Sequence, residues 1–241
     1  MSGERSESSL KGSLCDVFLT ALASGQTAAL EKRLGGKAVL SDPVNGTSQG
    51  GDALRAHVEK LAARFADKTI ARDCLILGAD RDVAADTVVG DDGELEYRVV
   101  IVAVRGKARE ITVRLYFPSD GEPPVAAALP ATDRVTLPGP VGAALDALAE
   151  KDVDEALGLL ESEGVVVDGA GRTHARAEDA ARTALVALCE AGMDCDPVGA
   201  ADDGRVCAVE GNFGRDDRRR PGVILFYRGD SGLFRRIVFQ V

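Results

Sequence analysis

The chain has 241 residues, a length that suits one large domain or two small ones. Hydrophobic residues make up 45% and charged residues 28%, which excludes a disordered chain, and a net charge of −10 argues against a protein that binds duplex nucleic acid. No apolar run reaches the roughly 20 residues of a membrane helix, and residues 1–9 lack the apolar core of a signal peptide. Five scattered cysteines without a CxxC pair favour reduced thiols in a cytoplasmic protein. With two histidines, no metal site is expected, and nothing indicates a cofactor.

The residue pattern in the first half of the chain predicts three helices around a short strand. Apolar residues at helical spacing indicate a helix over 14–25 and a shorter one over 29–34. A brief strand over 38–40 leads into the Asp42-Pro43 turn. The third helix, over 52–65, carries an apolar face made of Leu54, Val58, Leu61 and Phe65.

A run of strands follows in the first half, because branched residues alternate with Asp/Gly turns. The expected strands cover 70–77, 83–89, 95–104, 110–117 and 125–129. Helices followed by such a run predict a curved antiparallel sheet with helices on its concave side.

The second half repeats this order after a Pro/Gly-rich linker at 137–140. Its expected helices cover 141–150, 152–160 and 178–189, its short strand 165–167, and its later strands 194–200, 205–213, 223–228 and 234–240. An ungapped offset of about 126 residues places Ala21-Leu22-Ala23 on Ala147-Leu148-Ala149 and Asp42 on Asp168. The sequence therefore predicts a tandem repeat.

Two stretches carry a resemblance to a known family. Residues 38–46, with a short strand and an Asp-Pro turn, and the Gly-led helix start at 50–55 resemble the pattern of ketosteroid isomerases and SnoaL-like proteins of the NTF2-like, cystatin-like superfamily. The resemblance implies an α+β fold of two tandem cone-shaped domains, residues 10–136 and 137–241, each a curved antiparallel sheet wrapped around about three helices. We expect the two cones to be related by an approximate two-fold axis.

The resemblance also implies a cavity in each cone with Asp42 as a candidate general base and Asp168 as its weaker counterpart. A carboxylate at the rim of an apolar pocket resists ionisation, which makes it a better proton acceptor. The expected ligand-binding residues of the first cone are apolar: Phe18, Leu22, Val58, Leu61, Phe65, Leu115 and Phe117.

The chain departs from the isomerases at the groups that stabilise an oxyanion. Phe18 and Ala144 stand where the family has a Tyr, and Leu115 and Leu225 stand where it has a protonated Asp. None of these side chains donates a hydrogen bond, and losing one such donor costs on the order of 3 kcal/mol. Steroid isomerase activity is therefore not expected, and whether the protein is an enzyme stays open.

Several polar residues allow two interpretations. Asp42 and Asp168 are either site residues or turn residues that bond their own backbone. His57 lies beside the apolar face of its helix, which favours a surface or rim position over a catalytic acid, and His174 lies in a loop that could border a cavity.

Glu210 is, like Asp168, a weak candidate for a catalytic acid or ligand contact. By strand alternation it shares a face with Ala208 and Asn212. If this is the outer face, Glu210 is solvated or pairs across an interface, an ambiguity that Arg98, Arg114 and Tyr116 share. Two cones that pack through their outer sheet faces would form an intrachain pseudo-dimer, and the sequence leaves a further homodimer open.

Three classes of function remain. The first is binding of a small apolar molecule in one or both cones. The second is an enzyme of the isomerase, cyclase or epoxide-hydrolase type that uses Asp42 as its base. The third is a protein-interaction module without a ligand. Of these we expect ligand binding, with no nucleic-acid or membrane partner.

Overall fold

The computed structural model describes residues 13–24, 30, 38–66, 68–90, 92–106, 110–118, 128–132, 134–192, 194–214 and 219–241. These residues form two six-stranded sheets with the same strand order, β2-β1-β6-β5-β4-β3 in the first and β8-β7-β12-β11-β10-β9 in the second. Each sheet has one parallel pair, β1 with β6 and β7 with β12, and its other pairs are antiparallel.

The strands of the first sheet are β1 (Val39–Asp42), β2 (Gly46–Gln49), β3 (Thr69–Leu77), β4 (Arg81–Val89), β5 (Leu95–Arg105) and β6 (Ile111–Tyr116). Those of the second are β7 (Leu160–Val167), β8 (Thr173–Ala175), β9 (Cys195–Asp202), β10 (Val206–Phe213), β11 (Arg220–Arg228) and β12 (Phe234–Gln240). The helices are α1 (Leu14–Ser24) and α3 (Gly51–Phe65) in the first unit, and α4 (Gly139–Glu150), α5 (Val153–Gly158) and α6 (Ala180–Glu190) in the second.

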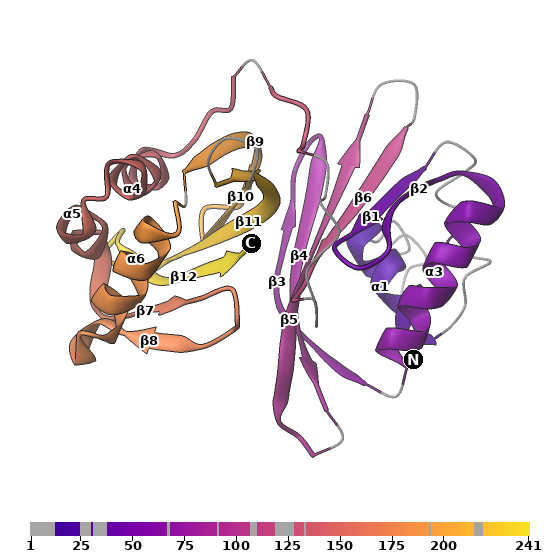
Figure 1. The fold of residues 1–241 in the computed structure, drawn as a ribbon, viewed down its shortest axis with the longest axis horizontal. Coiled ribbons are helices and arrows are strands. Elements are labelled where there is room, and N and C mark those ends of the chain that lie inside the picture. Colours follow the sequence, from indigo (N-terminus) through magenta and orange to yellow (C-terminus); the bar gives the residue numbers. More distant parts are fainter. Residues whose placement is uncertain are drawn as a thin grey trace, which may run out of the picture.

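Each sheet is covered by its own helices on one face only. Helices α1 and α3 bury their apolar faces in a core with β4, β5 and β6, while α4, α5 and α6 build a separate core on the second sheet. The helices lie on the two outer flanks of the molecule, and the sheets lie between them (Figure 1). The expected α+β fold of two sheet-and-helix units is confirmed.

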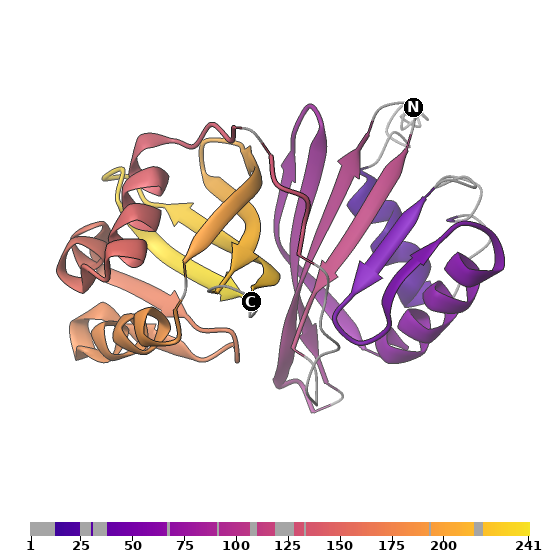
Figure 2. The same ribbon diagram turned by 45° about the horizontal axis from the view of Figure 1, so that its top comes forward.

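The two sheets pack against each other through the faces that the helices leave uncovered, as Figure 2 shows from a second direction. We call this contact the interface cluster; it consists of Ile76, Val83, Ala85, Val100, Val102, Tyr116, Val167, Ala201, Val206, Ala208, Val223, Leu225, Tyr227 and Val238. Strand β3 contacts β10 while β4 contacts β9. Because β3 corresponds to β9 and β4 to β10, these contacts are reciprocal, as a two-fold relation between the sheets would require.

Strand β5 illustrates why this arrangement suits the sequence. Val99, Ile101 and Ala103 belong to the helix-side core, and Val100 and Val102 belong to the interface cluster. Successive strand residues point to opposite faces, so a strand buried on both faces becomes an unbroken apolar run. The run Val99–Val104 is such a strand.

Most elements expected from the sequence agree with the structure within a few residues. The strand expected over 165–167 begins five residues earlier, at Leu160, where the helix expected over 152–160 was to end. Strands β2 and β8 were not expected, because GTSQ and THA have no apolar alternation. The expected strand over 125–129 is not formed at 128–129, and 125–127 lie outside the described residues. The helix expected over 29–34 lies outside them too, except for Leu30, which is helical and buried.

None of the five cysteines forms a disulfide, and Cys15, Cys189 and Cys207 are buried. In the part of the chain that the structure describes, no helix combines the length and apolar character needed to cross a membrane.

Candidate functional site

Asp42 ends β1 and closes the turn into β2. Its Oδ1 accepts the backbone N–H of Val44 and of Asn45, both at 2.7 Å, and its Oδ2 accepts the Asn45 side-chain amide at 3.0 Å. The side chain is fully buried and also bonds His57. Asp42 is therefore a turn residue and a member of a buried polar cluster at once.

His57 lies on α3 with its ring beneath the β1–β2 hairpin. It is 3% exposed, so the expected surface or rim position is wrong. Nε2 bonds the Asp42 carboxylate, and Nδ1 lies 2.9 Å from the Ser48 hydroxyl. A neutral ring satisfies both contacts if Nε2–H donates to Asp42 and Nδ1 accepts from Ser48. The sequence did not reveal this because Ser48 and Asp42 reach the helix only through the tertiary fold.

The electrostatics of Asp42 differ from the expectation. Burial raises the pKa of this carboxyl, but the hydrogen bonds from His57, the Asn45 side chain and the turn backbone outweigh burial and hold the pKa below its usual value. The expected rise in pKa, and with it the improved proton acceptor, is wrong for this arrangement. A carboxylate that already accepts four hydrogen bonds is a poor general base.

The expected ligand-binding residues of the first cone lie together, as a packed core. Phe18, Leu22, Val58, Leu61 and Phe65 are each at most 1% exposed and belong to one cluster with Leu115 and Phe117. The rings of Phe65 and Phe117 meet edge to face at 6.4 Å. Asp42 and His57 lie beside this core, where α3 meets the β1–β2 hairpin.

The register of the strands changes one expected correspondence. Leu40 pairs with Val113, and its counterpart Val166 pairs with Ile237, so the position equivalent to Leu115 is Phe239. Leu225, the residue expected there, instead lies in the interface cluster. Neither Leu115 nor Phe239 can donate a hydrogen bond, so neither unit has a side-chain donor at this position.

Asp168 repeats the turn of Asp42 in a more exposed setting. Its Oδ1 accepts the N–H groups of Ala170 and Arg172, each at 3.0 Å, and its Oδ2 accepts His174 Nε2 at 3.0 Å. Burial acts to raise its pKa, but the bonds from His174 and Arg172 lower it. His174 comes from β8 rather than from a helix, and this pair is only partly buried, with side-chain exposures of 12% for Asp168 and 24% for His174.

Glu210 lies between the two sheets, away from both cores. Its carboxylate accepts Arg114 through Nε and Nη2, both at 2.6 Å, the Tyr116 hydroxyl at 2.7 Å and Arg81 Nη1 at 3.2 Å. Burial and the adjacent Glu210 raise the pKa of Tyr116, so this phenol is neutral and donates. The expectation that Glu210 shares a face with Ala208 is confirmed, and that face is the outer one.

A second, partly buried acid joins the two sheets, and no pattern in the sequence indicated it. Asp73 on β3 accepts the Tyr227 hydroxyl at 2.8 Å and Arg236 at 2.7 Å from the second unit. Arg98, whose face was ambiguous, lies 3.4 Å from the same carboxylate. Arg98, Arg114 and Tyr116 therefore all serve the contact between the units.

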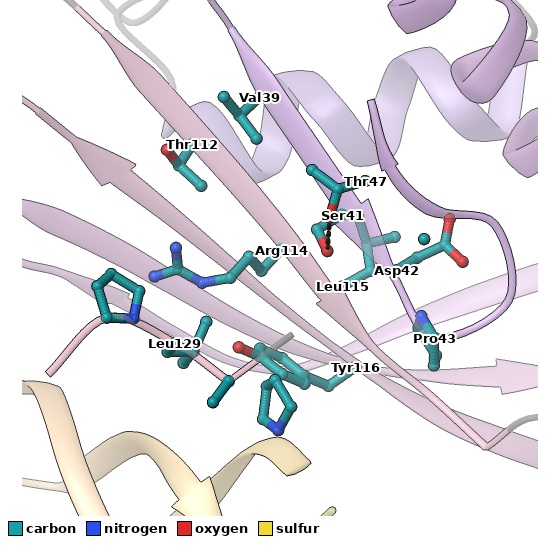
Figure 3. A pocket seen from close by; sticks show the side chains of 14 residues that line it. Val39, Ser41, Asp42, Pro43, Thr47, Thr112, Arg114, Leu115, Tyr116 and Leu129 are labelled. Carbon is teal, nitrogen blue, oxygen red and sulfur yellow. Dashed lines mark hydrogen bonds between the residues drawn. The ribbon is translucent and has the colours of Figure 1, made fainter. Parts of the chain in front are cut away.

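A pocket of about 470 Å³ opens beside the Glu210 cluster, where the first sheet meets the chain segment between the units (Figure 3). We call it the junction pocket. It is lined by Val39, Ser41, Asp42, Pro43, Gly46, Thr47, Thr112, Arg114, Leu115, Tyr116, Ala128, Leu129, Pro130 and Pro221. Ser41 pairs with Arg114 across β1 and β6, on the face opposite Leu40 and Val113. The pocket is thus on the outer face of the first sheet rather than inside a cone.

The far wall of the junction pocket is held by the second unit. Asn212 accepts the Leu129 N–H at 2.7 Å and donates to the Leu129 carbonyl at 3.0 Å. Thr132 donates to the Val198 carbonyl at 2.9 Å. Residues 128–132 are therefore anchored on the second sheet while they face the first.

No protein-family model matches the chain, and no curated protein matches it. Similar solved structures include an NTF2-like protein of unknown function from Cytophaga hutchinsonii, 18% identical over 44% of this chain and 87% of that one, with a TM-score of 0.34. A SnoaL-like protein of unknown function from Burkholderia thailandensis is 13% identical over 42% and 89%, with a TM-score of 0.35. An uncharacterised cystatin-fold protein from Novosphingobium aromaticivorans is 15% identical over 42% and 93%, with a TM-score of 0.35.

The chain is similar to SnoaL-like, NTF2-like and cystatin-fold proteins. Each of these matches covers less than half of this chain and most of the other protein. At such identities and TM-scores they carry no information on chemistry, which has to come from the site itself.

Proposed function

We propose that the protein binds a small molecule and that its site is the junction pocket. The observation that carries this proposal is the pocket itself, whose volume of about 470 Å³ lies within the range typical of small-ligand sites. Apolar side chains of Val39, Leu129 and three prolines combine there with the hydroxyls of Ser41, Thr47 and Thr112. In small-molecule sites, apolar side chains typically form most of the lining, and a few polar groups fix the orientation of the ligand.

The interior of a cone is the alternative location for a small apolar ligand. It finds less support, because the residues expected to line the first cone pack against one another with at most 4% exposure. A ligand inside the cone would have to separate these side chains and break their van der Waals contacts, whereas binding in a preformed pocket breaks none.

A thermal-shift screen of the full chain against small apolar and amphipathic molecules tests the function. A ligand at 100 times its dissociation constant stabilises the folded state by about 2.7 kcal/mol. Hits that Ser41→Phe abolishes and Leu61→Ala retains place the ligand in the junction pocket, since Ser41 faces it and Leu61 lies in the first core. The opposite pattern places the ligand in the cone, and a screen without hits favours the protein-interaction module.

An enzyme is the second candidate, favoured by the Ser48–His57–Asp42 chain. Asp42 itself is a poor base, but His57 Nδ1 lies 2.9 Å from the Ser48 hydroxyl while Asp42 orients the ring. This order of groups activates serine nucleophiles in hydrolases. Covalent labelling of Ser48 by a fluorophosphonate that is lost in His57→Gln would support hydrolytic chemistry over the isomerase, cyclase or epoxide-hydrolase type. If Ser48 is not labelled, the hydrogen bonds among Ser48, His57 and Asp42 serve the structure alone.

A further inference from the structure

We infer that the ligand of the junction pocket carries a carboxylate on an apolar body, and that Arg114 holds the carboxylate. The inference rests on the proposed function and adds the chemical class of the ligand. It follows from the unused donors of Arg114, from the balance of charge around Glu210 and from the distribution of polar groups along the pocket wall.

Arg114 is fixed and still has donors to offer. Its Nε and Nη2 are held by Glu210 at 2.6 Å, and no described residue accepts a hydrogen bond from Nη1. A guanidinium has five N–H groups in a rigid plane, so anchoring one edge positions the remaining donors. The side chain lies across the wall of the junction pocket in Figure 3, and its exposed fraction of 16% is the part that a ligand can reach.

The charge around Glu210 does not cancel. Two guanidinium groups, from Arg81 and Arg114, share this one buried carboxylate, and Tyr116 is neutral. Asp80 lies 3.5 Å from Arg81, but its side chain is 64% exposed, so water weakens its effect. The Asp42 carboxylate, at the pocket edge, is bonded to His57. The cluster of Arg81, Arg114 and Glu210 thus carries one more positive than negative charge, and Arg114 brings part of that excess to the pocket wall.

The polar groups occupy one side of the pocket. Thr112 precedes Arg114 by two residues on β6 and therefore projects from the same face, and Ser41 lies opposite Arg114 on β1. Leu129, Pro130 and Pro221 form the opposite, apolar side. A molecule with a carboxylate at one end and a hydrocarbon body matches both sides, whereas a uniformly apolar molecule removes water from Arg114 Nη1 and offers it no acceptor.

Isothermal titration of the full chain with decanoate, 1-decanol and decylamine tests the inference with one apolar body and three head groups. We expect decanoate to bind roughly 10 to 100 times more tightly than decanol, because a charged hydrogen bond adds about 1.5–3 kcal/mol, and decylamine to bind more weakly than both. Equal binding of decanoate and decanol would overturn the inference and leave the proposed function standing. Failure of all three to bind would overturn both.

Two variants should change decanoate binding in opposite directions. Arg114→Met combined with Glu210→Gln removes both partners together, and it should abolish the preference for decanoate while decanol affinity changes less than about threefold. Glu210→Gln alone leaves Arg114 and should tighten decanoate binding several-fold. NMR shifts of Thr112 and Leu129 would locate the ligand. If the double variant is unfolded, weaker decanoate binding by Glu210→Gln alone would overturn the inference.

Discussion

Asp42 and Asp168 occupy corresponding places in the two units, but they differ in how deeply they are buried. Both accept two backbone N–H groups of the turn that follows their strand. Only Asp42 is fully buried, because α3 covers it and contributes His57. The same residue in the same turn is thus fully buried in one unit and partly exposed in the other.

The buried bonds of Asp42 predict a pH-dependent contribution to stability. Its pKa is lowered in the folded protein, so its contribution is present above the unfolded value of about 3.9 and is lost as pH falls through the folded value. We expect Asp42→Asn to lower the free energy of unfolding by about 1–3 kcal/mol at pH 7 and by much less near pH 2. Urea unfolding at both pH values measures this.

Asp52→Asn is the matched control for Asp42, because the Asp52 side chain is 96% exposed and forms a surface ion pair with Arg55, three residues further along α3. It should change the unfolding free energy by less than about 1 kcal/mol. A loss for Asp42→Asn that is equal at pH 7 and pH 2 would show that the carboxylate charge is not the source of the stabilisation.

At the scale of elements, strand β10 anchors the segment that links the two units. Asn212 bonds both backbone groups of Leu129, much as a neighbouring strand would. The amide is suited to this because it offers a donor and an acceptor side by side.

Replacing Asn212 should loosen this anchor. Asn212→Ala leaves the Leu129 N–H and carbonyl without their partner, which costs about 1–3 kcal/mol, and the Leu129 amide should exchange with solvent about 10 times faster or more. Asn212→Asp is the matched control, since it keeps an acceptor for the N–H and loses the donor. We expect it to protect the Leu129 amide more than alanine does, as hydrogen exchange by NMR would show.

At the scale of the whole molecule, Glu210 joins the units through charge. Its carboxylate on β10 pairs with Arg114 on β6 and Arg81 on β4. We expect Glu210→Ala to lower the free energy of unfolding by about 3–5 kcal/mol, because the buried Arg81 and the partly buried Arg114 both lose their counter-charge. Asp154→Ala, which removes an ion pair whose acid is 80% exposed, should cost less than about 1 kcal/mol. Comparable losses in the two variants, measured by urea unfolding, would contradict this role.

The interface cluster leads to a prediction about the separate halves. Each sheet buries valines and other apolar residues against its partner, so a half produced alone exposes a broad apolar face. We predict that residues 10–136 and 137–241 each self-associate when expressed separately and form a one-to-one complex when mixed. Light scattering after size exclusion measures both, and soluble monomers of each half would show that the contact is not needed to cover these faces.

Local patterns in the sequence determined much of the architecture. Helical spacing of Leu54, Val58, Leu61 and Phe65 defined the buried face of α3, and β alternation correctly grouped Ala208 with Glu210. The order of elements in the two halves indicated the repeat, and the sheets confirm their common strand order. These features depend on residues within a few positions of each other, which is why a single sequence reveals them.

The tertiary structure alone decided which face of each strand is inside. In β5, Val99 and Val100 are equally apolar, so hydrophobicity cannot tell the helix side from the interface side. The same ambiguity hid the place of Glu210, the burial of His57 and the position of the junction pocket. Each depends on contacts between residues far apart in the chain, such as Arg114 with Glu210 and Asn212 with Leu129, and those form only when the two sheets pack together.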